Sequence, residues 1–144
     1  MTKYIFISGG VISGLGKGIT ASSIALLLQS CGIKVSPVKC DMYLNIDAGT
    51  MNPLEHGEVF VTDDGIEADQ DLGNYERFLN ISLGRENYIT AGQIYRQVLS
   101  AERALEYGGK CVEAYIHIPQ EIIRRLELLA KKTQVVLVEF GGTV

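Results

Sequence analysis

The first candidate for chemistry is a glycine-rich turn that follows the first apolar run of the chain. The apolar run covers residues 4–7, and the turn over residues 8–18 holds five glycines and Lys17. A helix-forming run follows at residues 21–29. A strand, a glycine-rich turn with a lysine, and a helix can hold nucleotide phosphates, because backbone N–H groups, the helix N-terminus and the lysine all carry positive charge.

The spacing of this turn departs from the standard phosphate loop, G-x-x-x-x-G-K-[ST]. Counted back from Gly16 and Lys17, the first glycine position holds Val11, and Gly18 stands where the hydroxyl residue belongs. Ser13 and Thr20 are the nearest hydroxyl residues. We interpret the turn as a variant phosphate loop, and the alternative is a glycine-rich turn of an ordinary doubly wound fold.

Two further charged residues are placed where ligands bind in α/β folds. Lys39 comes at the carboxyl end of a predicted strand over residues 34–39. Glu139 comes near the end of the apolar strand predicted over residues 134–140. The carboxyl ends of parallel strands meet at one sheet edge, where ligands bind. An exposed strand terminus is the alternative interpretation of Lys39.

Acidic residues alternate with neutral ones between Glu67 and Asp71. In an extended segment, Glu67, Asp69 and Asp71 would lie on one side. Mg²⁺ commonly takes one or two protein carboxylates together with phosphate oxygens, so Asp71 and Glu139 would suffice as its protein ligands. A solvated turn is the alternative for residues 67–71.

The composition limits the class of protein. A chain of 144 residues with 47% hydrophobic and 21% charged residues is typical of one soluble globular domain. Its net charge of −4 conceals an acidic segment, residues 41–90, with eleven acidic and two basic side chains. We see no basic stripe for nucleic acid, no membrane-spanning run and no secretion signal, so we expect a cytoplasmic protein. The three cysteines lack metal-ligand spacing.

Apolar periodicity predicts an α/β fold with a mostly parallel sheet flanked by helices. We expect strands at residues 3–8, 34–39, 111–116 and 134–140, and helices at 17–30, along the face with Ile94, Val98, Ala101 and Leu105, and from Pro119 onward. Residues 41–90 are expected to form a long irregular segment, with a short strand near 58–62 and a helix near 75–79. A segment of this kind within one domain is usually functional.

Five motifs along the chain are long and unusual. They are GGVISGLGKG at residues 9–18, NIDAGTM at 45–51, EHGEVFV at 55–61, DLGNYERF at 71–78 and VEFGGTV at 138–144. Together they closely resemble the N-terminal synthetase (amidoligase) domain of the CTP synthase family, and the resemblance covers the whole chain. It implies a phosphate-loop-like α/β fold, similar to dethiobiotin synthetase.

The resemblance also implies an activity. Family members are ligases that use ATP and Mg²⁺ to phosphorylate O4 of UTP, after which ammonia displaces phosphate and CTP forms. A separate C-terminal glutaminase domain, a glutamine amidotransferase, supplies the ammonia from glutamine. CTP is product and inhibitor, and the family assembles as homotetramers. We expect no nucleic-acid or membrane partner.

The roles of individual residues follow from the same resemblance. The ATP site would comprise Ser13, Gly14, Leu15, Gly16, Lys17, Gly18, Ile19 and Asp71. UTP would contact Ser13 and Lys39, Mg²⁺ would bind Asp71 and Glu139, and the catalytic residues would be Lys17 and Lys39.

The chain departs from the family pattern at Met42, at Gln70 and over residues 102–119. The last stretch bears on subunit contacts and the pyrimidine site in the family. Because the later part of the synthetase domain and the glutaminase domain are not in this sequence, we expect residues 1–144 alone to be inactive. A noncatalytic nucleotide-binding or assembly homologue remains an alternative. The motifs at 45–78 argue against a ligase of the dethiobiotin synthetase type.

Overall fold

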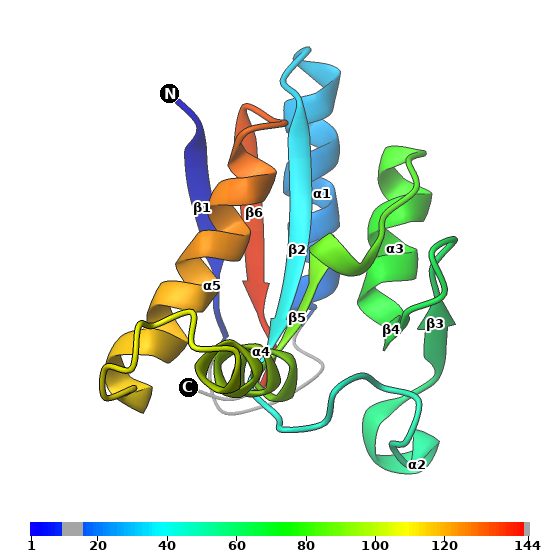
Figure 1. The fold of residues 1–144 in the computed structure, drawn as a ribbon. Coiled ribbons are helices and arrows are strands. Elements are labelled where there is room, and N and C mark those ends of the chain that lie inside the picture. Colours follow the sequence, from blue (N-terminus) through cyan, green and yellow to red (C-terminus); the bar gives the residue numbers. More distant parts are fainter. Residues whose placement is uncertain (10–15, 143–144) are drawn as a thin grey trace.

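A four-stranded parallel sheet forms the centre of the chain in the computed structural model, which describes residues 1–9 and 16–142. Its strands, in spatial order, are β1 (Lys3–Ile7), β6 (Val135–Phe140), β2 (Val35–Asp41) and β5 (Tyr88–Thr90). All three neighbouring pairs are parallel, as the sequence predicts. The last strand lies between the first two, so β1 and β2 do not pair directly (Figure 1).

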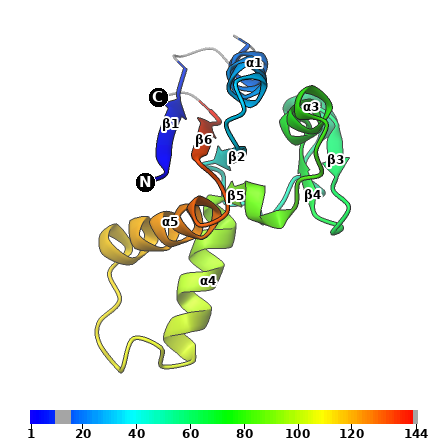
Figure 2. The ribbon, with the colours of Figure 1, turned by 90° about the horizontal axis from the view of Figure 1, so that it is seen from above.

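Helices cover both faces of the sheet (Figure 2). The core on one face joins α1 (Lys17–Ser30) and α3 (Gln70–Leu79) to Leu137, and the core on the other joins α4 (Ala91–Arg103) and α5 (Ala114–Ala130) to Val136 and Val138. Successive side chains of a strand point to opposite faces, so β6 contributes to both cores. None of the described helices is long and apolar enough to cross a membrane.

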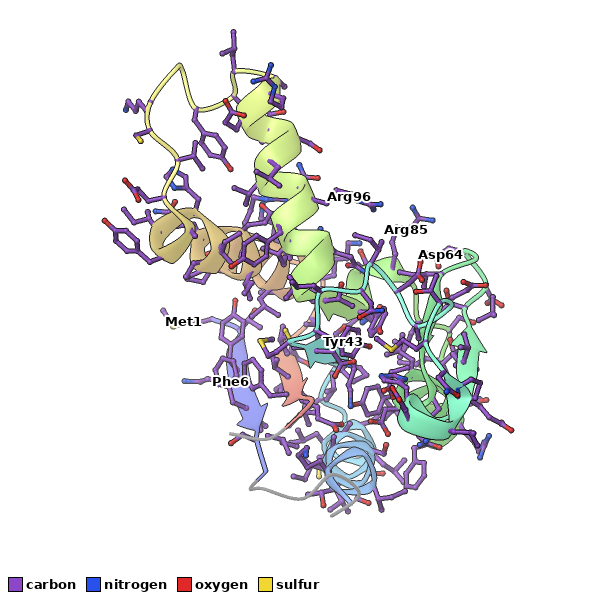
Figure 3. The ribbon with its side chains drawn as sticks, turned by 90° about the horizontal axis from the view of Figure 1, so that it is seen from below. Met1, Phe6, Tyr43, Asp64, Arg85 and Arg96 are labelled. Atoms are coloured by element: carbon purple, nitrogen blue, oxygen red, sulfur yellow. The ribbon has the colours of Figure 1, made fainter. Side chains whose placement is uncertain are left out.

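The acidic segment is more regular than expected. It contains α2 (Pro53–His56), the antiparallel pair β3 (Val59–Val61) and β4 (Glu67–Asp69), then α3, and the 3-10 helix η1 (Arg85–Asn87) before β5. Most of these elements have only three or four residues, too few for periodicity to reveal. Asp64, between β3 and β4, accepts hydrogen bonds from the backbone N–H and Nε of Arg85 at 2.8 and 3.3 Å (Figure 3).

The expectations for residues 105–119 are wrong in three respects. Residues 111–116 form no strand, because Ala114 already begins α5. Pro119 lies inside that helix rather than opening it. Leu105 has a left-handed backbone (φ 60°) beyond the end of α4 and is exposed. The apolar residues before Pro119 suggested a strand, but their spacing continues the helical pattern that ends in Leu126 and Leu129.

Gly92→Ala is expected to destabilise the fold. A Cβ on Gly92 would lie 2.1 Å from the carbonyl oxygen of Leu44, a backbone atom of the loop after β2. Overpacking of this kind costs about 1–3 kcal/mol, more than the roughly 1 kcal/mol that alanine gains over glycine in a helix. Urea unfolding measures the difference. Ser100→Ala, exposed on the same helix, is the control and should be neutral; equal stabilities for the two variants would contradict the packing argument.

Candidate functional site

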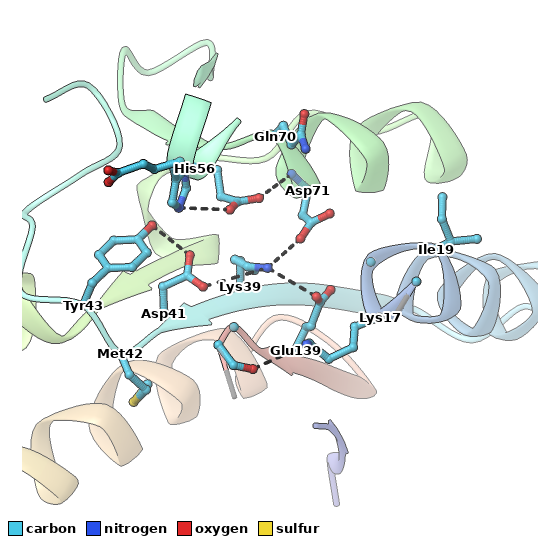
Figure 4. Close-up of a pocket in the computed structure, with 16 residues that line it drawn as sticks. Lys17, Ile19, Lys39, Asp41, Met42, Tyr43, His56, Gln70, Asp71 and Glu139 are labelled. Atoms are coloured by element: carbon cyan, nitrogen blue, oxygen red, sulfur yellow. Dashed lines mark hydrogen bonds and ion pairs between the residues drawn. The ribbon is translucent and has the colours of Figure 1, made fainter. Parts of the chain in front are cut away.

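The carboxyl edge of the sheet opens into a cavity of about 560 Å³. Lys39 of β2 and Glu139 of β6 are direct neighbours in the parallel register, so both side chains point to the same face. The lining residues come from four regions of the chain: the start of α1, the end of β2, the segment from α2 to α3, and the end of β6. Figure 4 shows the carboxylates of Asp41, Asp71 and Glu139 around the ammonium group of Lys39.

Lys39 lies among carboxylates. Its Nζ is 2.5 Å from Asp71 Oδ2, 3.3 Å from Glu139 Oε1 and 3.9 Å from Asp41 Oδ1. The side chains of Lys39 and Glu139 are almost fully buried (6% and 1% exposed), whereas that of Asp71 is 22% exposed and faces the cavity. Asp71 is therefore the carboxylate in this trio that a ligand can reach most easily.

The charges of this cluster depend on one another. Burial alone would lower the pKa of Lys39, but Asp41, Asp69, Asp71 and Glu139 together raise it above its ordinary value. Burial raises the pKa of Glu139, and Lys39 opposes that shift. Burial also raises the pKa of Asp41 to about 7, although Lys39 opposes this too. Lys39 is thus a permanent cation, suited to electrostatic stabilisation and unsuited to act as a base.

The first turn of α3 positions Asp71. The side chain of Asp69 caps this helix by accepting the backbone N–H of Asp71 at 2.7 Å. The extended arrangement expected for residues 67–71 is therefore wrong, because β4 ends at Asp69 and the helix starts at Gln70. A Cβ on Gly18 would lie 2.3 Å from Asp71 Oδ1. Glycine stands in the hydroxyl position of the loop because the Asp71 carboxylate approaches the backbone there.

Glu139 is held on both sides. Lys39 donates to its Oε1, and the hydroxyl of Tyr75, one turn after Asp71 in α3, donates to its Oε2. Tyr75 is fully buried. Both oxygens of this buried carboxylate thus have a hydrogen-bond donor, which buried polar groups require.

A second polar group borders the cavity. The ligand atoms of Asp41, His56 and Asp69 lie within 4.8 Å of one another, with His56 Nε2 at 3.5 Å from Asp69 Oδ2. Tyr43 donates to Asp41 Oδ2 at 2.9 Å, and its hydroxyl also contacts that of Tyr88. Asp41, His56 and Asp69 could together approach a cation. The pair Asp71 and Glu139, however, already converges on a positive charge, that of Lys39.

The structure brings most of the sequence-predicted site residues together. Those lining the cavity are Gly16, Lys17, Gly18, Ile19, Lys39, Asp71 and Glu139. Ser13, Gly14 and Leu15 lie outside the described residues. Glu67 does not join them: its carboxylate lies against Gly49. The roles of all these residues stay predictions.

Sequence reasoning missed Asp41 and Tyr75. Asp41 could have been found, because it follows Lys39 by two residues and so shares its face of β2. Tyr75 carried no local signal, since its partner Glu139 lies 64 residues away.

Comparisons with known proteins agree with the motifs. The family described as CTP synthase N-terminus matches residues 3–144. The chain is 60% identical to the CTP synthase of Nautilia profundicola and 57% identical to that of Pyrococcus furiosus, each over 144 residues, and 54% identical to a Campylobacter jejuni CTP synthase over 143 residues. The matches cover 100%, 100% and 99% of this chain but 26%, 27% and 26% of the relatives. The chain thus spans about a quarter of the length of these relatives.

Asp41→Asn is expected to change the pH dependence of stability. The pKa of Asp41 is about 7 in the fold, whereas an unfolded aspartate has a pKa of about 3.9. The stability contributed by the protonated carboxyl is complete below the unfolded pKa and is lost as the pH rises through about 7. Between pH 5 and pH 8 the free energy of unfolding of the variant, measured with urea, should therefore rise relative to that of the wild type by on the order of 2 kcal/mol.

Asp63→Asn is the control for this measurement, because Asp63 is exposed and away from the cavity. Its stability should follow that of the wild type across the same pH range. Parallel curves for Asp41→Asn and the wild type would show that Asp41 ionises normally in the fold.

Proposed function

This chain belongs to the CTP synthase family, and on that premise we propose that its cavity binds ATP, Mg²⁺ and UTP for the conversion of UTP to CTP. The observation that carries the proposal is the convergence of Lys39, Asp71 and Glu139 at the sheet edge, beside the start of α1. A reaction that transfers a phosphoryl group requires mainly positioning, fixed positive charge and a metal ion.

The start of α1 would hold the ATP phosphates. Gly16, with φ 81°, precedes the helix, and among the residues that the structure describes no side-chain cap is found at this helix start. Lys17 is the first residue of the helix and lines the cavity with Gly18 and Ile19. The N–H groups of a helix N-terminus, the helix dipole and an ammonium group together favour a polyphosphate at this point.

Asp71 and Glu139 fit a divalent cation. Both are oxygen donors, and both already approach one cationic atom, Lys39 Nζ, so they converge on a position that holds positive charge. Mg²⁺ prefers oxygen ligands and commonly binds through one or two carboxylates with substrate phosphates. When bound, it would offset negative charge on the phosphates during transfer.

The residues of this chain would act mainly by orientation and charge. In the proposed reaction the γ-phosphoryl group passes from ATP to O4 of UTP, leaving ADP; ammonia then attacks C4, and the C–O bond breaks to release phosphate and CTP. Lys39, held protonated by its carboxylate neighbours, stabilises negative charge on the phosphoryl oxygens. Lys17 holds the ATP phosphates in line.

The remaining features of the family belong to the same proposal. Ammonia would come from glutamine through a glutaminase, the protein would act in the cytoplasm, CTP would inhibit it, and it would assemble as a homo-oligomer. Ser13 would contact ATP and UTP.

The test is CTP formation by the natural polypeptide with UTP, ATP, Mg²⁺ and ammonium ions. Asp71→Asn is expected to lower the rate by at least about 100-fold, because loss of a metal ligand removes several kcal/mol of transition-state stabilisation. Asp63→Asn, an exposed acid outside the cavity, should keep the wild-type rate. If the wild type binds Mg-ATP and UTP but forms no CTP and releases no phosphate, the noncatalytic alternative replaces this proposal.

Gly18→Ala is expected to affect metal binding without lowering the stability of the fold. The new Cβ would displace the Asp71 carboxylate, whereas alanine improves the helix by up to about 1 kcal/mol. We expect Mn²⁺ binding to weaken about tenfold with no loss of thermal stability. Ser30→Ala, at the far end of α1, is the control and should bind Mn²⁺ normally. Normal Mn²⁺ binding by Gly18→Ala would mean that Asp71 is not a ligand or that it can move freely.

A further inference from the structure

One oxygen of Glu139 is occupied from inside the core. The hydroxyl of Tyr75 donates to Glu139 Oε2, while Oε1 is the oxygen that shares Lys39 with Asp71. Tyr75 is fully buried in the core formed by α1, α3 and β6, and it does not line the cavity. Glu139 therefore presents Oε1 to the cavity side and Oε2 to the core.

We propose that Tyr75 is a specificity-determining residue that restricts Glu139 to one metal-binding oxygen and so favours Mg²⁺ over Ca²⁺. This inference rests on the proposed function, in which Asp71 and Glu139 hold the divalent cation. Tyr75 acts through Glu139 and does not itself touch the metal.

The argument follows from what the two cations require. Mg²⁺ takes six ligands in a near-ideal octahedron at about 2.0–2.1 Å, whereas Ca²⁺ takes six to eight ligands at about 2.3–2.6 Å and often uses both oxygens of a carboxylate. With Oε2 bound to Tyr75, a bidentate Glu139 would have to give up a buried hydrogen bond. That cost falls on Ca²⁺ and not on Mg²⁺.

Neighbouring residues also fix the positions of the two metal-binding carboxylates. Tyr75 follows Asp71 by four residues in α3, so one helix carries a metal-binding carboxylate and the group that restrains the other. Asp71 is restrained as well, because its Oδ1 lies against Gly18 and its Oδ2 against Lys39. A small, rigid set of oxygens suits Mg²⁺ better than Ca²⁺.

The experiment measures cation preference by displacement of Mn²⁺, followed by electron paramagnetic resonance, in the natural polypeptide. Mg²⁺ and Ca²⁺ are titrated separately against bound Mn²⁺. Tyr75→Phe is expected to lower the ratio of the Ca²⁺ Kd to the Mg²⁺ Kd by about tenfold or more, the scale on which outer-shell partners alter metal affinity. Tyr75→Leu, a second variant without the hydroxyl, should shift the ratio in the same direction.

Tyr88→Phe is the matched control. Tyr88 is also fully buried and its hydroxyl contacts another hydroxyl, that of Tyr43, rather than Glu139. It should keep the wild-type ratio. If the Tyr75 variants weaken binding of both cations equally, or leave the ratio unchanged, Tyr75 has only a structural role and the inference is overturned.

Asp71→Asn distinguishes this failure from failure of the proposed function. If Asp71→Asn binds Mn²⁺ as the wild type does, the metal site itself is wrongly assigned. If Asp71→Asn loses Mn²⁺ binding while the Tyr75 variants keep the wild-type ratio, the site stands and the role of Tyr75 is disproved.

Discussion

The buried ammonium group of Lys39 is the charge on which the arrangement of this site depends. Asp41, Asp69 and Glu139 are each at least nine-tenths buried, and like charges so close together would repel one another without a cation. An unpaired buried charge costs several kcal/mol, so loss of the lysine would strain the edge of the sheet and the start of α3 together. The pairing of β2 with β6 secures the contact, because it places Lys39 and Glu139 side by side.

This constraint explains why distant segments have their particular residues. Asp71 reaches Lys39 only because α3 begins immediately after β4, and it fits there only because residue 18 has no side chain. Asp69 serves the same arrangement as the cap of α3. The glycine at the hydroxyl position of the first loop is thus part of a geometry in which the Asp71 carboxylate occupies the space of a hydroxyl side chain.

The parts of the site that lie on regular strands could be predicted from the sequence. Lys39 and Glu139 could be brought together because parallel strands end at one sheet edge. Asp71 lines the cavity, but the geometric reason for selecting it from the sequence fails, since it lies on a helix and not on an extended segment. Tyr75 and Gly18 could not be interpreted, because their contacts depend on how α3 packs against α1 and β6. The prediction that Pro119 begins a helix failed for another reason. Tertiary packing of α5 outweighs the local preference of proline for a helix start.

The central position of β6 has a consequence for the order in which the protein can form during synthesis. Strands β1 and β2 are made first but are joined only through β6, which the ribosome adds about a hundred residues after β2. Until β6 is made, the strand that lies between β1 and β2 is missing, and Lys39 lacks its neighbour Glu139. Completion of the sheet and assembly of the charged cluster must therefore occur together and late. Both depend on contacts between residues far apart in the sequence, so we expect slower folding than in a chain whose strands pair locally.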